Sequence, residues 1–408
     1  MSKLDELINE LCPEGVEYKA LWEVTIWDKK FNAVERSKQK KVYTYPYMLA
    51  NDLFKLERKE GDVFLLSTGE RTGWTTEELA GNYLCEGEVV AIPWGGTPNV
   101  KYHKGKFVTA DNRIATSIDT ELLSNKFLYY WMQSNIDTIA SYYRGSGIKH
   151  PSMKDILDMQ IPLPPLAVQQ EIVRILDNFT ELTAELTAEL TAELTARRKQ
   201  YEYYRDLLLT MEDKPETKWM KLGEIADFRN GKGHEKAIAE DGKFIVVNSK
   251  FISTNGQVVK FTNQQISPLY IEDILIVMSD LPNGKALAKC FLVDENNRYT
   301  LNQRIGALRV KNKNIIDTKF LYYFLNRNRQ LLKYDNGVDQ TNLKKNEILS
   351  VNIPIIPLKE QKRIVAILDR FDALCNDLTS GIPAEIEARQ KQYEYYRDKL
   401  LSFKEVTA

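Results

Sequence analysis

An internal duplication limits the folds open to this chain more than any other feature of its sequence. The 22 residues from Ile161, IPLPPLAVQQEIVRILDNFTEL, return at Ile353 as IPIIPLKEQKRIVAILDRFDAL, with 12 identical positions. At the same spacing of 192 residues, ARRKQYEYYRDLLL from Ala196 returns as ARQKQYEYYRDKLL from Ala388, with 12 of 14 positions identical. A repeat at a fixed period indicates a repeated structural unit. The 408 residues are therefore predicted to form two homologous halves.

Weaker similarities precede each copy in the same order. TADNRIATSI at Thr109 corresponds to TLNQRIGALRV at Thr300, and KFLYYWMQSN at Lys126 corresponds to KFLYYFLNRN at Lys319. Short β-like runs alternate with turns in both regions, as in GEVVAIPWGG and EDILIVMSD, so both are predicted to be mixed α/β domains. The predicted boundaries are a first globular domain at 1–160, a helical segment at 161–214, a second globular domain at 215–352 and a second helical segment at 353–408.

Each of the two helical segments is predicted to contain a long helix. Apolar residues recur at helical spacing from Leu166, and no Gly or Pro interrupts the run to Met211. Its centre, TELTAELTAELTAEL from Thr180, repeats every four residues. A fully solvated helix would leave these glutamates repelling one another, so packing of the Leu and Ala face against a partner helix is favoured. In the second copy, Gly381 and Pro383 should kink or restart the helix.

Two rods of equal length that arise by duplication can pair antiparallel about a pseudo-two-fold axis. The predicted fold class is therefore α/β, more exactly described as α+β. Two mixed α/β domains are separated by two long helices, which pair as an antiparallel coiled coil.

The sequence lacks the motifs of several common enzyme classes. We find no P-loop GxxxxGK[ST], no GxSxG and no [ND]PP[FY] motif of a DNA adenine methyltransferase. His103, His150 and His234 are far from one another and from cysteine, so neither a metal nor any other cofactor is expected. The cysteines form no CxxC pair and are predicted to be reduced packing residues: Cys12, Cys85, Cys290 and Cys375.

The sequence also carries no signal for a membrane or for export. No run of about 18 apolar residues is present. The first residues, MSKLDELINELCPEG, contain acids and lack the apolar core of a signal peptide. A cytoplasmic location is expected.

The distribution of charge and of loop residues favours a DNA-binding function. The net charge is -1, but residues 217–353 contain 21 basic and 14 acidic residues, and basic side chains supply much of the affinity for phosphates. Arg and Lys pair with guanine edges, and Asn and Gln pair with adenine. Any single one of these side chains could equally be an ordinary solvated loop residue. The candidate DNA-binding residues are Arg71, Trp74, Trp94, Lys101, Lys104, Lys106, Arg113, Arg144, Lys149 and His150 in the first half, and Arg229, Lys232, His234, Lys236, Asn248, Lys250, Asn283, Lys285, Gln303, Arg304, Asn342 and Lys344 in the second.

Taken together, these motifs resemble the specificity (S) subunit of type I restriction-modification enzymes, in the group with TAEL repeats (type IC-like). The resemblance is carried by IPLPPLAVQQEIVRILDNF and its copy, by the TAEL run and by the two RKQYEYYRD-type blocks. The duplicated layout extends it over essentially the whole chain, whereas the globular halves match the family only in layout.

The resemblance implies two target-recognition domains, each reading one half of an interrupted, bipartite site in double-stranded DNA. It further implies that two methyltransferase (M) subunits dock on the helical segments and that motor-nuclease (R) subunits join them. ATP, S-adenosylmethionine and magnesium would belong to those partners, and this chain would be non-catalytic. The leucine faces and six tyrosines are expected to form contact surface for the partners: Tyr201, Tyr203, Tyr204, Tyr393, Tyr395 and Tyr396.

Two other functions remain open at this point. The long helices could belong to a scaffold protein that does not recognise DNA. Alternatively, the chain could be a self-contained DNA-modifying enzyme, because Asp, Glu and Lys are abundant enough to form a nuclease centre.

Overall fold

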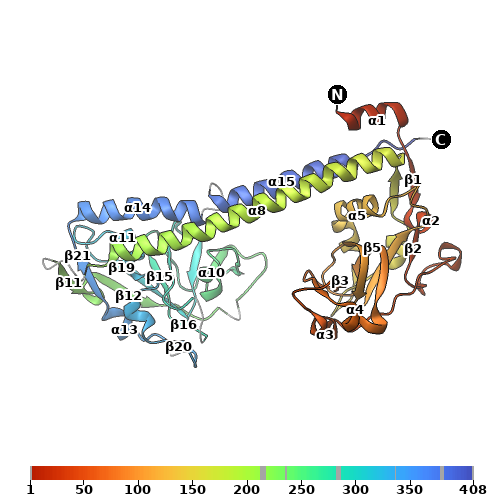
Figure 1. Ribbon diagram of the computed structural model, residues 1–408. Coiled ribbons are helices and arrows are strands. Elements are labelled where there is room, and N and C mark those ends of the chain that lie inside the picture. The colour runs from red at the N-terminus through yellow and green to blue at the C-terminus, as the bar shows by residue number, and fades with distance from the viewer. Residues whose placement is uncertain are drawn as a thin grey trace. The chain divides into compact units, whose positions relative to one another are not determined.

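The computed structural model divides the chain into two compact units, each built from both halves of the sequence (Figure 1). Unit 1 comprises Met1–Glu189 and Ile386–Ala408, and unit 2 comprises Leu190–Glu385. Each unit therefore combines one globular domain with helical segments from both repeats. The residues that the structure describes are 2–211, 217–234, 237–281, 286–335, 337–376 and 381–406.

Unit 1 contains a six-stranded sheet in the order β2-β7-β5-β6-β3-β4. Neighbouring strands are antiparallel, except that β3 and β6 are parallel. The strands of unit 1, both within and outside this sheet, are β1 Glu17–Ala20, β2 Thr25–Trp27, β3 Val63–Leu66, β4 Gly73–Thr75, β5 Cys85–Pro93, β6 Lys101–Thr109, β7 Asn112–Ser117, β8 Tyr143–Arg144, β9 His150–Pro151 and β10 Gln160–Leu163. Its helices are α1 Lys3–Leu11, α2 Leu21–Val24, α3 Ala50–Leu53, α4 Glu77–Ala80, α5 Asn125–Ser134, α6 Ile136–Ser141 and α7 Met153–Leu157, with 3-10 turns η1 Arg36–Lys38, η2 Phe54–Leu56 and η3 Gly81–Tyr83.

Unit 2 contains a four-stranded sheet, β12-β19-β15-β17, and a three-stranded sheet, β14-β13-β18. Its strands are β11 Lys218–Lys221, β12 Ala226–Asn230, β13 Phe244–Val247, β14 Phe261–Thr262, β15 Ile274–Val277, β16 Ser279–Asp280, β17 Cys290–Leu292, β18 Tyr299–Leu301, β19 Ile305–Val310, β20 Thr341–Asn342 and β21 Asn352–Ile355. Its helices are α9 Leu222–Ile225, α10 Ser249–Ser253, α11 Thr318–Leu325, α12 Arg329–Leu332, α13 Lys345–Leu349 and α14 Leu358–Asn376.

The two globular domains share one strand topology. In unit 1, the nine-residue strand β6 pairs antiparallel with β5 and parallel with β3. In unit 2, the same two pairings are divided between β17, which is antiparallel to β15, and β18, which is parallel to β13. The four residues of β15 are all buried, as expected for a strand covered on both faces. The fold therefore confirms the duplication in the globular domains, where the sequence similarity is weak.

Helix α8, Leu166–Leu209, runs without interruption for 44 residues and belongs to unit 1 in its first part and to unit 2 in its second. It begins after Pro164 and Pro165, which suit the start of a helix but not its interior. The second copy is interrupted as predicted, because α14 ends at Asn376 and α15, Ile382–Leu400, restarts with Pro383 in its first turn. Residues 377–380 lie outside the described part of the chain.

Each unit pairs α8 with a helix of the other repeat. In unit 1, the rings of Phe179 and Tyr396 are 6.3 Å apart, so the first part of α8 packs on α15. In unit 2, the rings of Tyr204 and Phe371 are 5.7 Å apart, so the second part of α8 packs on α14 (Figure 1). Both Phe residues and both Tyr residues are related by the repeat spacing of 192 residues. The same helix contact is therefore formed once in each unit.

A repeated set of polar contacts fixes each globular domain to its long helix. The buried Gln169 accepts a hydrogen bond of 2.9 Å from the backbone of Ser124, the N-cap of α5, and the buried Gln361 accepts one of 2.7 Å from Asp317, the N-cap of α11. One carboxylate on each long helix also binds a lysine and a tyrosine of the domain. These contacts, each 2.7 Å long, join Lys126 and Tyr130 to Asp177, and Lys319 and Tyr323 to Asp369.

In unit 1, the end of the chain returns to its beginning. The backbone of Val16 donates to the carbonyl of Lys404 at 2.9 Å and accepts from Val406 at 3.1 Å. Helix α1 is attached through Lys3, whose amine lies 3.2 Å from the carboxylate of Glu171 on α8. Hydrogen bonds from Arg174 and Lys3 lower the pKa of Glu171 to about 2, so this pair is charged at neutral pH.

No helix in the described residues is both long and apolar enough to cross a membrane.

Candidate nucleic-acid interface

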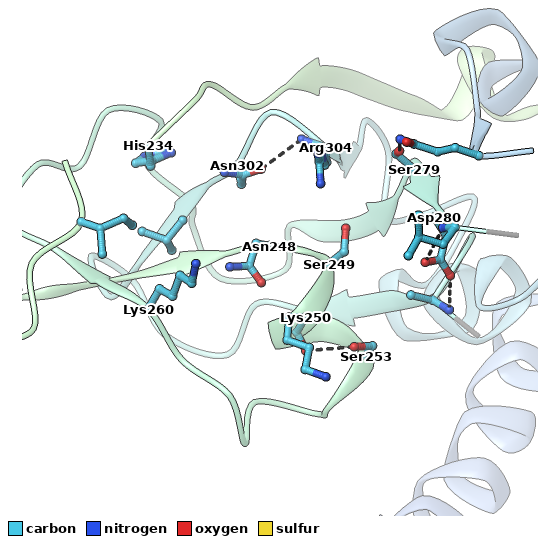
Figure 2. Close-up of a pocket in the computed structure, with 15 residues that line it drawn as sticks. His234, Asn248, Ser249, Lys250, Ser253, Lys260, Ser279, Asp280, Asn302 and Arg304 are labelled. Atoms are coloured by element: carbon cyan, nitrogen blue, oxygen red, sulfur yellow. Dashed lines mark hydrogen bonds between the residues drawn. The ribbon is translucent and has the colours of Figure 1, made fainter. Parts of the chain in front are cut away.

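A polar pocket of about 840 Å³ lies in unit 2, at the ends of β13, β15 and β18 (Figure 2). It brings together four of the predicted DNA-binding residues, His234, Asn248, Lys250 and Arg304. These residues come from three separate segments, since His234 follows β12, Asn248 and Lys250 lie at the start of α10, and Arg304 precedes β19. The fold therefore brings them to one pocket although they span 70 residues of sequence. The remaining lining residues are Ile238, Val246, Ser249, Ser253, Lys260, Ser279, Asp280, Leu281, Ala286, Asn302 and Gln340.

Several pocket residues hold the walls in place. Asp280 accepts backbone hydrogen bonds from Ala286 at 2.7 Å and from Leu287 at 3.1 Å, which joins β16 to these two residues. His234 is 1% exposed, and its two ring nitrogens bind the carbonyl of Lys232 at 2.8 Å and the hydroxyl of Thr300 at 2.9 Å. The predicted direct DNA contact by His234 is therefore not supported, and its imidazole instead joins the loop after β12 to β18.

The other described residues predicted in the second half are not among the residues that line this pocket. Arg229 is half-buried and paired at 2.6 Å with Asp273, a carboxylate that it shares with Arg309. Asn342 is exposed on β20, which pairs with β16 at the edge of the pocket. Lys232, Gln303 and Lys344 are also exposed. Lys236, Asn283 and Lys285 lie outside the described residues.

In unit 1, six of the ten predicted residues have exposed side chains, most of them engaged with a neighbour. Trp74 is 44% exposed, and its ring packs edge-on against Phe64 at 5.3 Å. Arg144 pairs with Asp155 at 3.1 Å. Arg71 pairs with Glu57, and Lys104 pairs with Glu88 at 3.4 Å. The six exposed residues are Arg71, Trp74, Lys104, Arg144, Lys149 and His150. Lys106 is half-buried and pairs with Glu77 at 2.5 Å.

Three predicted residues of unit 1 are turned into the domain. Arg113 is 4% exposed, stacks 3.8 Å from the centroid of the Trp94 ring and pairs with Asp111 at 2.9 Å. The amine of Lys101 donates to the carbonyl and the hydroxyl of Ser67 at 2.8 and 3.0 Å. Burial lowers the pKa of Lys101 to about 8. Direct DNA contact by Arg113 and Lys101 is not supported, since both side chains are engaged in internal contacts. Trp94 is half-buried beneath Arg113.

The strand registers change one detail of the predicted repeat alignment. The sequence match of TADNRIATSI with TLNQRIGALRV places Arg113 opposite Arg304. In the fold, however, the backbone N–H of Trp94 donates to the carbonyl of Asp111, and the backbone N–H of Met278 donates to the carbonyl of Arg304 at the same point of the sheet. The structural counterpart of Arg304 is therefore Asp111, because the strand partners are offset by 193 residues rather than 191.

Sequence reasoning missed part of the pocket. Ser249, Lys260, Asn302 and Gln340 were not predicted, although all four line it. Ser249 and Asn302 each adjoin or lie close to a predicted residue, Asn248 and Arg304 respectively, and could have been found from the polar runs that follow β13 and β18. Gln340 also lies close to a predicted residue, Asn342. Lys260 carries no such signal, because only strand pairing brings it to the pocket.

The six tyrosines of the repeated blocks differ in exposure. Tyr203 and Tyr395 are 65% and 62% exposed, and each packs edge-on against the next tyrosine at 5.4 Å. Tyr201 is buried beside Phe371 and Tyr393 is half-buried, so the expectation that all six form open contact surface was wrong for these two. Tyr204 and Tyr396 are exposed by 38% and 42%.

Comparison with known proteins identifies the family. The model of the type I restriction modification DNA specificity domain matches residues 13–196 and 215–388. The specificity subunit of the type I restriction enzyme EcoR124I/EcoR124II of Escherichia coli is 32% identical, over 99% of this chain and 97% of that protein. A Haemophilus influenzae protein described as a type I restriction enzyme specificity subunit, S.HindORF215P, is 34% identical over 80% of this chain and 86% of its own length.

The fold has also been observed before. A solved chain, from work on complex assembly and conformational transition of the type I R-M system, superposes with a TM-score of 0.58 at 16% identity, covering 96% of this chain and 98% of that one. The family match covers both repeats, and the fold agrees with it. The chain belongs to the type I restriction-modification DNA specificity family.

Proposed function

We propose that this chain is the DNA-specificity subunit of a type I restriction-modification complex and that each unit reads one half of an interrupted DNA site. The observation that carries the proposal is the repeated strand topology in two units of a chain from this family. Two copies of one recognition scaffold supply two reading surfaces, and their loops differ in sequence, so the two half-sites should differ. We infer that the globular domains at 1–160 and 215–352 are the recognition domains.

We further propose that the chain contributes recognition and not catalysis. Its relatives are named as specificity subunits of restriction enzymes, and a subunit named for specificity supports a role in recognition. DNA cleavage and methylation, with their ATP, S-adenosylmethionine and magnesium, would then belong to the partners. The excess of basic residues in 217–353 supplies attraction to phosphates, and partner subunits would add to it.

Sequencing of methylated DNA from cells that produce this chain together with its methyltransferase tests the proposed function. We expect one two-part motif with a gap of constant length and a methylated adenine in each half, because two fixed surfaces read one DNA molecule. Deleting this chain should abolish methylation of that motif. Methylation at an uninterrupted motif, or methylation that persists without the chain, would contradict the proposal.

We propose that the methyltransferase subunits dock on the exposed tyrosine pairs Tyr203–Tyr204 and Tyr395–Tyr396. The two pairs occupy equivalent positions of the repeat, 192 residues apart, and have nearly the same geometry, with interplanar angles of 74° and 73°. Exposed aromatic residues on long helices are typical anchors of protein interfaces. Two equal anchors predict two copies of one partner, and thus a complex of one specificity subunit with two methyltransferase subunits.

Replacing both outward tyrosines tests this docking surface. The double variant Y203A/Y395A should weaken methyltransferase binding by about 2 kcal/mol or more at each site, as expected for an interface anchor. Size-exclusion chromatography with light scattering should then show the complex of one to two in the wild type and its dissociation in the variant. Tyr83, which is 40% exposed on the globular domain of unit 1, provides the control variant Y83A. Equal loss in the control, or no loss in the double variant, would argue against the proposed surface.

A further inference from the structure

The polar pocket of unit 2 differs in charge from the same place in unit 1. At the turn that leads into β19, unit 2 has the exposed Arg304. At the matching turn into β7, unit 1 has Asp111, which is paired with Arg113 at 2.9 Å and lies 3.6 Å from Lys29. A shared scaffold with opposite charges at one position is what two readers of different sequences require.

The hydrogen-bonding groups left over in this pocket are mainly donors. The carboxylate of Asp280 accepts from three backbone N–H groups, including Leu281 at 2.9 Å. The side-chain oxygens of Asn248 and Asn302 accept from the backbones of Phe251 at 2.9 Å and Arg304 at 3.3 Å. Within the described part of the chain, no hydrogen bond or ion pair involves the Arg304 guanidinium, the amines of Lys250 and Lys260, or the amide nitrogens of Asn248 and Asn302.

A buried hydroxyl in the same pocket points to a bound group. The Ser249 oxygen is buried without a hydrogen-bond partner in the structure, although buried polar atoms are rarely left unpaired. Figure 2 shows Ser249 on α10 below Arg304, which enters from the opposite side of the pocket. A ligand that presents hydrogen-bond acceptors between these two side chains would satisfy both.

We propose that Arg304 reads a guanine of the half-site bound by unit 2, with Asn302 and Ser249 beside it in the pocket; this assignment rests on the proposed function. The major-groove edge of guanine presents two acceptors, N7 and O6, and a guanidinium matches both at once. Adenine and cytosine each present a donor on this edge, which a pocket of donors would repel or leave unpaired. The exposed Lys250 and Lys260 then supply charge for the flanking phosphates.

The walls of the pocket are rigid enough for such discrimination. His234 joins one wall to β18, Asp280 joins β16 to Ala286, and the Gln340 amide donates to the Ser279 hydroxyl at 2.7 Å. Contacts of this kind order the walls around Arg304 before the DNA binds, so that less of the binding free energy is lost in ordering them.

The test is the methylated motif produced by the full chain with its methyltransferase. For R304A, we expect one guanine of the second half-site to become degenerate, with discrimination against other bases at that position reduced about 5- to 150-fold. The first half-site and the gap should stay unchanged. R304K, which keeps the charge but loses the two-pronged donor, should relax the same position to a smaller extent. The matched control is R298A, since Arg298 is an exposed arginine of unit 2 paired with Glu295 outside the pocket.

The outcomes separate this assignment from the proposed function. Weaker methylation of an unchanged motif in R304A would mean that Arg304 contacts a phosphate, and would overturn the base-reading role. An unaltered motif at unaltered efficiency would remove Arg304 from the interface. In both cases the wild-type chain would still produce a two-part motif, whereas failure of the proposed function would leave no such motif to compare. Circular dichroism of the purified complexes would identify a variant that fails to fold.

Discussion

Exchanging residues 215–352 for the matching region of a related specificity subunit should change one half of the methylated motif and leave the other half unchanged. The globular domain of unit 2 has its own hydrophobic cores, formed around residues such as Phe320 and Leu275. Unit 1 has separate cores, which include Phe127 and Leu65. Because each mismatched base pair costs about 1–3 kcal/mol, a few changed contacts are enough to move methylation to a new half-site.

The structure shows what the exchange must preserve. Strand β11 pairs with β21, with Lys218 opposite Ile355 and Lys221 opposite Asn352. The exchanged region contains all of β11 but only the first residue of β21, so the exchange pairs a foreign strand with a native one. Backbone hydrogen bonds tolerate changes of side chain, but buried positions such as Ile353 must still fit the graft. A second exchange of 222–349, which leaves both strands native, controls for this junction.

The reciprocal exchange of 1–160 completes the experiment. It should alter only the other half of the motif, and a chimera with both exchanges should read the two new halves at the original gap. Methylome sequencing of cells carrying each chimera decides the outcome. If either single exchange altered both halves, or altered neither while methylation continued, the assignment of one half-site to each unit would be wrong.

The sequence was sufficient to predict the architecture because its signal is local and repeated. The 192-residue spacing gave the duplication, the uninterrupted run from Leu166 gave α8, and Gly381 with Pro383 gave the restart of the second helix. The predicted antiparallel pairing of the two rods also implied which helix segments share a unit, but the sequence could not show which side chains make the contacts. The contacts of Phe179 with Tyr396 and of Tyr204 with Phe371 join residues far apart in sequence, and both partners look alike in every local pattern.

The candidate site was less predictable for a related reason. Composition identifies basic and amide residues in loops, but it does not show whether a side chain points outward. Arg113 carries the charge expected of a DNA contact, yet it stacks on Trp94 and pairs with Asp111. The alignment of Arg113 with Arg304 was also misleading, because it uses an offset of 191 residues, whereas the partners of β7 and β19 are offset by 193. The N-caps of the next helices, Ser124 and Asp317, have the same offset of 193, so no residue is inserted between β19 and α11. Lys260 reaches the pocket through the pairing of β14 with β13, which is not encoded near Lys260 itself.

Deleting one TAEL unit, Thr187 to Leu190, should shorten the nonspecific gap of the DNA motif by about one base pair and leave both half-sites intact. Four residues account for about 6 Å of helix and about 400° of rotation, so residues beyond the cut keep nearly the same face. The repeat then supplies an equivalent leucine at the place of Leu190, which is 9% exposed. A shift of about 6 Å equals nearly two base pairs at a rise of about 3.4 Å each. An inclined, compliant pair of rods transmits only part of this shift along the DNA, so the expected change is about one base pair.

Deleting only two residues of the repeat should instead abolish assembly. The two parts of α8 would turn by about 200° relative to each other. The first part is committed to the core of unit 1 through Ile172 and Leu176, and the second to the core of unit 2 through Leu194 and Tyr201. One helix cannot present both sets correctly after such a turn, so one unit would expose its apolar face. Substituting alanine at the same two positions, without changing the length, is the control. Methylome sequencing and size-exclusion chromatography of the complexes decide the matter: a constant gap after the four-residue deletion, or full methylation after the two-residue deletion, would show that α8 does not set the spacing.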